Sequence, residues 1–395
     1  MLTRQGAIAT AVSVTLVVAG RLFGIFELFV VGAGGAALVI GAVAITGLTR
    51  LRLDVSRQVR PGRIHAGEPA TVTLLATNGG RRRTPVIQLR DAVGPGRTAS
   101  VVLSPLAPGE HITAAYSLPG ERRGRIGVGP LEVRVSDPFG LAALSAPAAP
   151  VVQLIVWPAV ERVMAPSPAL GRDHDLGAPV ELSATGDEFY ALRPYADGDD
   201  LRRVHWRASA KRDDLVVRQD ERPGRGQATI VLDTRTGVYG GDTFERAVSA
   251  AASVAMACAR SGLLLRLVTT AGHDSATTNP VAGFDPVEPI LDHLAVVAPR
   301  DVGHLASVVA SMERAGRDQG ARVVVVTGDG RAGELGEAST PTANSASVTL
   351  VVFTSGVGGA EPPPTNRSVV VVDESISFGS AWSRSNTAPA PGVRV

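Results

Sequence analysis

The sequence of 395 residues is poor in cysteine, lysine, aromatic side chains and net charge. Its single cysteine, Cys258, excludes an internal disulfide and any zinc site built from several cysteines. The 39 basic and 37 acidic residues leave a formal net charge of +2. Such a balanced chain has no strongly basic body to hold a polyanion, so we predict no nucleic-acid partner. Lys211 is the only lysine, and this arginine bias makes arginine clusters weak evidence of function.

The apolar residues are concentrated at the amino-terminal end. Residues 1–48 contain 31 apolar residues and three charged ones. About 20 apolar residues in a helix cross the hydrocarbon core of a membrane. We therefore predict two transmembrane helices, at about 6–26 and 28–48, within a segment 1–49. Small residues allow close contact between such helices, and three glycines of the second run are candidates: Gly32, Gly34 and Gly35.

The charges that flank the two runs predict their orientation. Arg4 precedes the first run, and Arg50, Arg52, Arg57 and Arg60 follow the second. Positive residues gather on the cytoplasmic side, so we expect a multi-pass protein of the plasma membrane with both termini in the cytoplasm. The alternative is a cleavable signal peptide, which would have a small-residue cleavage site and no second span directly after it.

Residues 50–157 alternate apolar and polar side chains between turn signals, which favours a β-sandwich-like module. The Asp-Pro-Phe-Gly-Leu run at 137–141 predicts a turn that places Phe139 and Leu141 on an apolar surface. Residues 158–185 are rich in Pro, Ala, Ser and Gly, and we expect a linker. The strands expected in the module are 71–78, 84–93, 99–106, 111–118, 130–137 and 151–158.

Residues 227–377 alternate strand and helix patterns, which predicts a doubly wound α/β sheet whose ligands would lie at the carboxyl ends of the strands. We expect a polar, disordered tail at 378–395. The expected strands are 228–233, 263–270, 321–329, 347–353 and 368–374, and the expected helices are 243–260, 285–297 and 303–318.

The segment 186–226 has a different composition, with nine acidic and nine basic residues and four of the 16 aromatic residues. This density of charge is typical of an ion-paired surface or a recognition site. We expect a helix at about 201–211, capped by Asp199 or Asp200. A strand at 215–221 should follow, with 228–233 returning as its partner.

The segment contains a spaced pattern of fifteen residues: Gly186, Glu188, Phe189, Leu192, Arg193, Tyr195, Gly198, Asp199, Arg202, Trp206, Ser209, Ala210, Leu215, Val217 and Arg218. With this pattern the sequence resembles domain-of-unknown-function family 58, and the Arg-Gly-Arg to Asp-Pro-Phe-Gly-Leu run at 123–141 resembles that family's upstream module.

The resemblance implies a membrane-anchored protein with a von Willebrand A-like domain. Members are often encoded beside MoxR-type AAA+ ATPases and transglutaminase-like membrane proteins, which are the partners we expect, in envelope-associated assembly or regulation. The main hypothesis is a non-enzymatic scaffold or adaptor that binds a protein partner. Nine residues form either its interface or a structural ion-pair network: Glu188, Arg193, Tyr195, Asp199, Asp200, Arg202, His205, Trp206 and Arg218.

Two further functions stay open. Von Willebrand A-like domains place an Asp-x-Ser-x-Ser motif at the end of their first strand, where it holds Mg²⁺. Here Asp233 fits, but Arg235 and Gly237 replace both serines. We therefore expect no bound Mg²⁺ and no other cofactor, and Asp233 would pair with Arg235 or another arginine. A hydrolase using His205 is the third possibility, and it would need a partner within hydrogen-bond reach. Cys258 is expected in an inert core.

Overall fold

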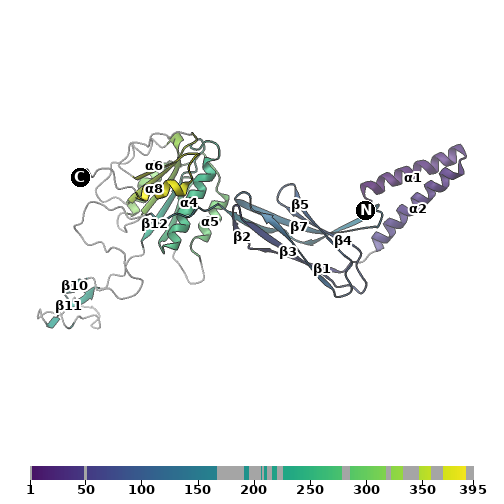
Figure 1. Cartoon of the computed structure of the whole chain (residues 1–395), viewed down its shortest axis with the longest axis horizontal. Coiled ribbons are helices and arrows are strands. Elements are labelled where there is room, and N and C mark those ends of the chain that lie inside the picture. Colours follow the sequence, from purple (N-terminus) through teal and green to yellow (C-terminus); the bar gives the residue numbers. More distant parts are fainter. Residues whose placement is uncertain are drawn as a thin grey trace. The chain divides into compact units, whose positions relative to one another are not determined.

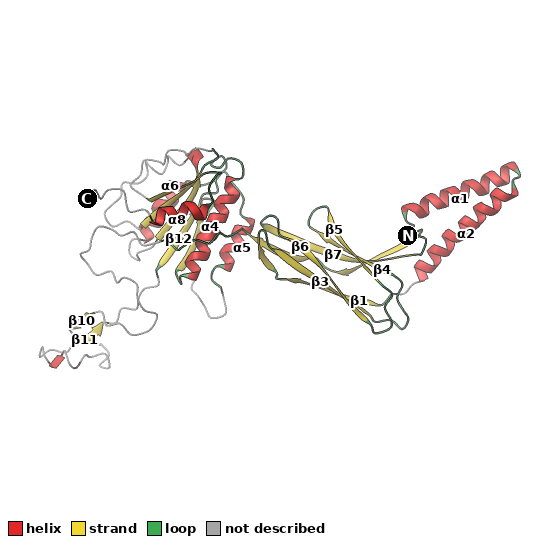
Figure 2. Ribbon diagram, in the orientation of Figure 1, coloured by secondary structure: helices red, strands yellow, loops and turns green. Residues whose placement is uncertain are grey.

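The computed structural model describes residues 2–48, 51–166, 191–194, 206, 209–210, 216–219, 226–277, 285–316, 322–331, 347–356 and 368–387. The chain forms two compact units. The first comprises Met1–Ala159 and Leu291–Val297, and the second comprises Val160–Ile290 and Ala298–Val395. The elements are shown in Figure 1 along the chain and in Figure 2 by type.

Two apolar helices begin the first unit, α1 (Arg4–Phe23) and α2 (Phe26–Leu48). Both are long and apolar enough to cross a membrane, and only 17% of each apolar window is buried. Their exposed side chains include Leu22 and Phe26, at 76% and 73% exposure. A helix from the core of a soluble protein would bury such side chains. The two helices predicted from composition are therefore present.

The helices approach each other at two of the three expected glycines. A Cβ atom on Gly32 would lie 2.7 Å from the backbone nitrogen of Val17, and one on Gly35 would collide with the hydroxyl of Ser13. Gly34 faces open space. The prediction of close contact is confirmed for Gly32 and Gly35 and is wrong for Gly34, because Gly34 lies on the other side of the helix.

Two β-sheets follow in the same unit. One has the order β1-β3-β6, and the other has the order β2-β9-β7-β4-β5, with β8 paired to β7. The sequence pattern did not predict β1, β2 and β8. The strands are β1 (Leu53–Arg60), β2 (Arg63–His65), β3 (Pro69–Asn78), β4 (Ile87–Val93), β5 (Arg97–Leu103), β6 (His111–Pro119), β7 (Gly124–Ser136), β8 (Ala143–Ala149) and β9 (Val152–Trp157).

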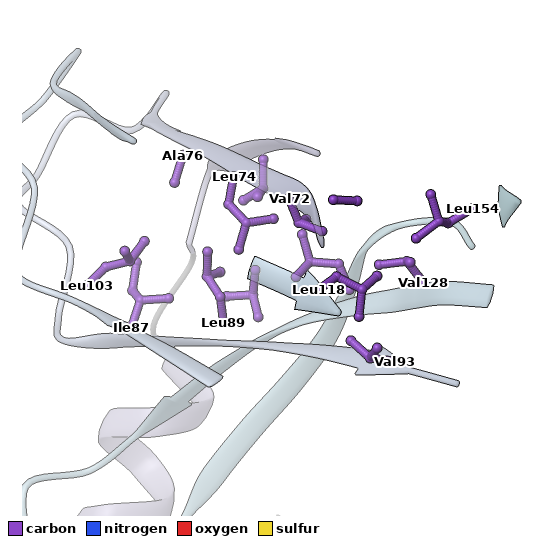
Figure 3. Packing of buried hydrophobic residues seen from close by; sticks show 14 of the residues in the cluster. Val72, Leu74, Ala76, Ile87, Leu89, Val93, Leu103, Leu118, Val128 and Leu154 are labelled. Carbon is purple, nitrogen blue, oxygen red and sulfur yellow. The ribbon is translucent and has the colours of Figure 1, made fainter. Parts of the chain in front are cut away.

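One hydrophobic core joins these two sheets. Val72, Leu74 and Ala76 alternate along β3 and are at most 1% exposed, because alternate residues of a strand point to the same face. They belong to the same buried cluster as Ile87 and Leu89 of β4. Figure 3 shows side chains of both sheets meeting in this cluster.

Two notable features lie outside this core. Arg57 and Asp91, each with a 1% exposed side chain, form an ion pair, and the hydroxyl of Tyr116 donates to Asp91 over 2.7 Å.

The predicted turn at 137–141 is present, with Leu141 buried at 9% exposure. Phe139, however, is 66% exposed, so the expectation that it also packs on an apolar surface is wrong within this unit.

The second unit contains a five-stranded sheet of order β13-β12-β14-β15-β16, and all its pairs are parallel. The α/β pattern predicted from 227 onward is therefore present. Its elements are β12 (Gln227–Leu232), α4 (Thr243–Arg260), β13 (Leu264–Thr269), α5 (Glu288–Val296), α6 (Leu305–Gly316), β14 (Arg322–Gly328), the 3₁₀ turn η3 (Asp329–Arg331), β15 (Ser347–Phe353), β16 (Ser368–Val372) and α8 (Phe378–Thr387).

Side chains on both faces of this sheet are buried. Val231, Val323 and Val325 form a cluster with Leu305 and Val309 of α6. The alternate residues of β12, Ile230 and Leu232, are also 0% exposed. Strands that are apolar on both faces are typical of a parallel sheet covered on both sides.

The expected disordered tail is wrong for residues 378–387, which form α8. Phe378, Ala381 and Trp382 are spaced i, i+3 and i+4 along it and are buried. The indole of Trp382 donates to the backbone oxygen of Met164 over 2.9 Å, and the amide of Gly379 donates to the carboxylate of Glu161. Part of the expected linker is therefore held to the second unit.

Candidate functional site

The strand order of the second unit defines where a ligand site would lie. In chain order the five strands read 2-1-3-4-5, so the direction of strand addition reverses between β12 and β14. Parallel sheets of this kind bind ligands at the carboxyl ends of the strands beside that reversal. Asp233 comes directly after β12, at this position. Its neighbours are Thr270, directly after β13, and Thr327, near the end of β14.

The carboxylate of Asp233 is enclosed by donors from its own chain. Arg235 donates its Nε to Oδ1 over 3.0 Å and its Nη2 to Oδ2 over 2.9 Å. The backbone amide of Arg235 also donates to Oδ1 over 3.1 Å. The side chain of Asp233 is 0% exposed and that of Arg235 is 2% exposed. The sequence prediction that Asp233 pairs with Arg235 is therefore confirmed.

Two threonines complete the shell around this carboxylate. The hydroxyl of Thr327 donates to Oδ2 over 2.9 Å, and that of Thr270 lies 3.3 Å from Oδ1. Thr270 also accepts the backbone amide of Thr234 over 2.9 Å. These bonds join Asp233 to the ends of both neighbouring strands, so the ionised carboxylate has the hydrogen-bond partners that a buried charge needs.

Tyr239 closes the cluster on the backbone side. Its hydroxyl donates to the backbone oxygen of Asp233 over 2.7 Å. Burial of the phenol, together with the negative charge of Asp233, holds the pKa of Tyr239 well above its ordinary value. Tyr239 is therefore a neutral donor in this position and does not act as a base.

This donor set does not fit Mg²⁺. Magnesium prefers six oxygen ligands in an octahedral arrangement. A guanidinium beside Asp233 repels a cation and already occupies both carboxylate oxygens. Gly237 supplies no side chain where the motif has its second serine, and its φ of 78° suits glycine. Across the described residues, no group of three or more His, Cys, Asp or Glu side chains could hold a metal ion.

Sequence reasoning identified Asp233 and Arg235 but missed Thr270, Thr327 and Tyr239. The two threonines end apolar strand runs, Leu-Val-Thr-Thr at 267–270 and Val-Val-Thr at 325–327. A polar residue at the carboxyl end of a buried strand is the signal that would have found them.

The signature segment is described only in part. Strand β10 (Ala191–Pro194) pairs antiparallel with β11 (Val216–Gln219), which places Leu192 opposite Arg218 and Arg193 opposite Val217. The expectation that β12 pairs with this strand is wrong, because β12 lies between β13 and β14. The remaining predicted residues lie outside the described residues: Glu188, Tyr195, Asp199, Asp200, Arg202 and His205.

Trp206 is the one predicted anchor whose side-chain exposure the structure describes. It is helical and 65% exposed. Ser209 and Ala210 are helical as well, in agreement with the expected helix.

Cys258 lies on the buried face of α4 and is 0% exposed. Desolvation raises the pKa of its thiol to about 12. A thiol that remains protonated is a poor nucleophile. The prediction that Cys258 belongs to the core is confirmed.

Comparison with solved structures gives partial matches at low identity. The CARDB domain of the PF1109 protein from Pyrococcus furiosus is 16% identical, and the match covers 27% of this chain and 91% of that chain, with a TM-score of 0.20. The putative ApaA protein from Bordetella pertussis is 18% identical, with 27% and 93% covered and a TM-score of 0.20. None of these likenesses bears on what the chain does.

Among curated proteins there is no match. Residues 191–334 match the model of the family described as protein of unknown function DUF58. This range contains β10, β11, the buried pair of Asp233 and Arg235, and the first three strands of the parallel sheet. Through residues 191–334, therefore, the chain is similar to this family of unknown function.

Proposed function

We propose that this protein is a membrane-anchored, non-enzymatic scaffold or adaptor whose α/β unit binds a protein partner, a MoxR-type AAA+ ATPase, in envelope-associated assembly or regulation. In this proposal α1 and α2 cross the plasma membrane with both termini in the cytoplasm. The two sheets of the first unit form a sandwich-like spacer, and the parallel sheet of the second is von Willebrand A-like and doubly wound.

The observation that carries the proposal is the pairing of Asp233 with Arg235. At the edge of the sheet where ligands usually bind, the carboxylate is neutralised from within, and its two oxygens accept bonds from Arg235, Thr270 and Thr327. A buried pair with this many hydrogen bonds is a structural element. We therefore propose that this unit functions by binding a partner on its outer surface, and not by binding a ligand at this edge of the sheet.

Trp206 supports the position of that surface. At 65% exposure it offers a large apolar area to a partner. It lies in a segment with nine charges of each sign, which suits electrostatic matching to another protein. We propose the signature segment as the contact site for the ATPase.

The membrane part of the proposal rests on α1 and α2. Their outward side chains are apolar, whereas the start of α1 and the chain after α2 carry arginine: Arg4 is the first residue of α1, and Arg50 and Arg52 follow α2. Positive charge at those ends favours a cytoplasmic location for both.

The test is capture of the ATPase by the full-length protein in native membranes. A photo-crosslinking residue in place of Trp206 should capture the ATPase, and Trp206→Ala should weaken its pull-down while leaving the melting temperature unchanged. Val302→Ala, at another exposed apolar side chain of the second unit, serves as the matched control. A fall in melting temperature with unchanged pull-down would assign Trp206 to stability and reject the interface.

Two alternatives belong to other classes. A metal-dependent, adhesion-type ligand binder would use Asp233, and Mg²⁺ titration of the full-length protein should then raise its melting temperature. A hydrolase would use His205, and His205→Ala would then fail to complement a deletion strain. Unchanged melting and full complementation reject both alternatives.

A further inference from the structure

The turn at 137–142 is a closed and rigid loop. The Oδ1 of Asp137 accepts the amide of Phe139 over 2.9 Å, and its Oδ2 accepts the amide of Ala142 over 2.5 Å. Gly140 takes a φ of 68°, a conformation that favours glycine. Asp137 is itself only 5% exposed. The single carboxylate therefore organises the loop and leaves no charge on its outer side.

This loop is attached to the start of α1. The amide of Thr3 donates to the backbone oxygen of Leu141 over 2.9 Å, and its hydroxyl donates to that of Gly140 over 2.6 Å. The backbone of Leu141 lies so close to Gly6 that a Cβ atom there would collide with it. The loop and the first turn of α1 therefore form one packed piece.

The same loop also contacts α2. Leu141 and Ala142 form a buried cluster with Val39 and Ala42 of α2. Those two residues lie nine and six positions before Leu48, the last residue of α2. At about 1.5 Å per residue, the contact is about 9–14 Å along the helix from its end. The loop thus lies beside the last apolar turns of the helix.

The outer side of the loop is apolar and exposed. Phe139 is 66% exposed, and Leu144, at the start of β8, is 43% exposed. No charged residue occurs from 138 to 160. In water an exposed phenylalanine on a rigid uncharged loop is unfavourable, whereas the headgroup region of a bilayer accepts aromatic side chains readily.

We propose that the turn at 137–142 is a membrane-interface element, in which Phe139 inserts at the boundary between lipid headgroups and acyl chains. This inference rests on the proposed membrane insertion of α1 and α2. The partner is the bilayer, because the loop is continuous with the two apolar helices through Leu141 and Ala142. The turn then fixes the first unit to the membrane surface at a second point.

The test uses the full-length protein reconstituted in vesicles, with Cys258→Ala as background. Single cysteines at Phe139, Leu38 and Val102 are labelled with an environment-sensitive fluorophore, in separate samples. Leu38 is an exposed residue of α2, and Val102, at 65% exposure on β5, matches Phe139 in exposure. Lipids carry a doxyl quencher near the headgroup or at the end of the acyl chain.

We expect the label at Phe139→Cys to be quenched most strongly by the doxyl group near the headgroup, and the label at Val102→Cys to be quenched by neither. The label at Leu38→Cys reports on α2 itself. Quenching at Leu38→Cys without quenching at Phe139→Cys overturns this inference and leaves the membrane anchor in place. Blue-shifted but unquenched emission at Phe139→Cys also overturns it, because protein then covers the site. Absence of quenching at all three positions rejects the membrane anchor itself.

Discussion

Arg235 and Asp233, two residues apart, form a buried ion pair in which the guanidinium occupies both carboxylate oxygens, at 3.0 and 2.9 Å. The geometry is that of a bidentate arginine–carboxylate pair, which fixes orientation as well as charge. Both partners of the pair come from the same loop, directly after β12. The end of β12 is therefore organised partly by its own loop and partly by Thr270 and Thr327 of the neighbouring strands.

Removing the arginine should destabilise the second unit strongly. Arg235→Ser leaves the Asp233 carboxylate buried without its cation, which typically costs about 3–5 kcal/mol. This loss is measured by urea unfolding of the full-length protein in detergent, with the exposure of the Cys258 thiol as the readout. Arg260→Ser, at an exposed arginine on α4, is the matched control and should change the unfolding free energy little. Equal effects of the two substitutions would show that the pair is not a stabilising element.

Replacing Arg235 should create a magnesium response. Arg235→Ser restores the first serine of the Asp-x-Ser-x-Ser pattern and leaves Asp233 in need of a cation, while Gly237 is kept because its φ of 78° suits glycine. Mg²⁺ at about ten times its Kd would then stabilise the folded state by about 1.4 kcal/mol. Thermal unfolding with Mg²⁺ and with chelator checks this, and the natural sequence should show no difference. Stabilisation of the natural sequence by Mg²⁺ would contradict the assignment of the pair as closed.

Cys258 should resist modification in the folded protein. Its pKa is raised from 9.0 to about 12, a difference of three pKa units, by burial. The thiolate fraction near neutral pH is then lower on the order of 10³-fold than in the unfolded chain. Labelling with a maleimide before and after denaturation measures the ratio. Rapid labelling of the native protein would mean that α4 opens readily.

The stability of the first unit should depend on pH through Asp292. Its burial favours the protonated form, but hydrogen bonds from Arg63 and Trp157 outweigh this effect and hold the pKa of Asp292 below its ordinary 3.8. A carboxyl group whose pKa is lower in the folded state stabilises the protein at pH values above its pKa in the unfolded chain. This stabilisation is lost as the pH falls through the pKa of the group in the folded protein. Because the side chain of Arg63 is 44% exposed, we expect this ion pair to contribute less than about 1 kcal/mol to the free energy of unfolding.

The comparison of Asp292→Asn with the natural sequence tests this dependence. Their urea midpoints should differ near pH 7 and converge once the pH falls below the lowered pKa that Asp292 has in the folded protein. Asp54→Asn, at an exposed acid of β1, controls for the loss of a surface carboxylate. A difference that persists at low pH would mean that the substitution acts by packing and not by charge.

Periodicity predicted the elements whose burial pattern is regular. The helix expected at 243–260 is observed as Thr243–Arg260, and the strand expected at 347–353 as Ser347–Phe353. In both, an unbroken apolar face or run leaves only one way to bury the side chains. Asp233 was predictable as well, because it ends such a run.

Other features depend on contacts between distant parts of the chain. Strand β8 has mostly exposed side chains and is held largely by its backbone pairing with β7, so its sequence pattern carries little signal. The composition of α8 is mostly polar, and its three buried apolar residues, Phe378, Ala381 and Trp382, give too weak a pattern to predict a helix. Thr270 and Thr327 meet Asp233 only because β13 and β14 flank β12. Strand order is a property of the whole sheet, and no local pattern contains it.

The position of β12 has a mechanical consequence. It is the strand that follows β11 along the chain, and it lies between two parallel neighbours, β13 and β14. Under the proposed function, a pull by the ATPase on the signature segment would enter the sheet at the start of β12. A pull along the strand would load the hydrogen bonds on both sides of β12 in shear. A strand with two parallel neighbours would resist unfolding under such a pull, because many hydrogen bonds would have to break together.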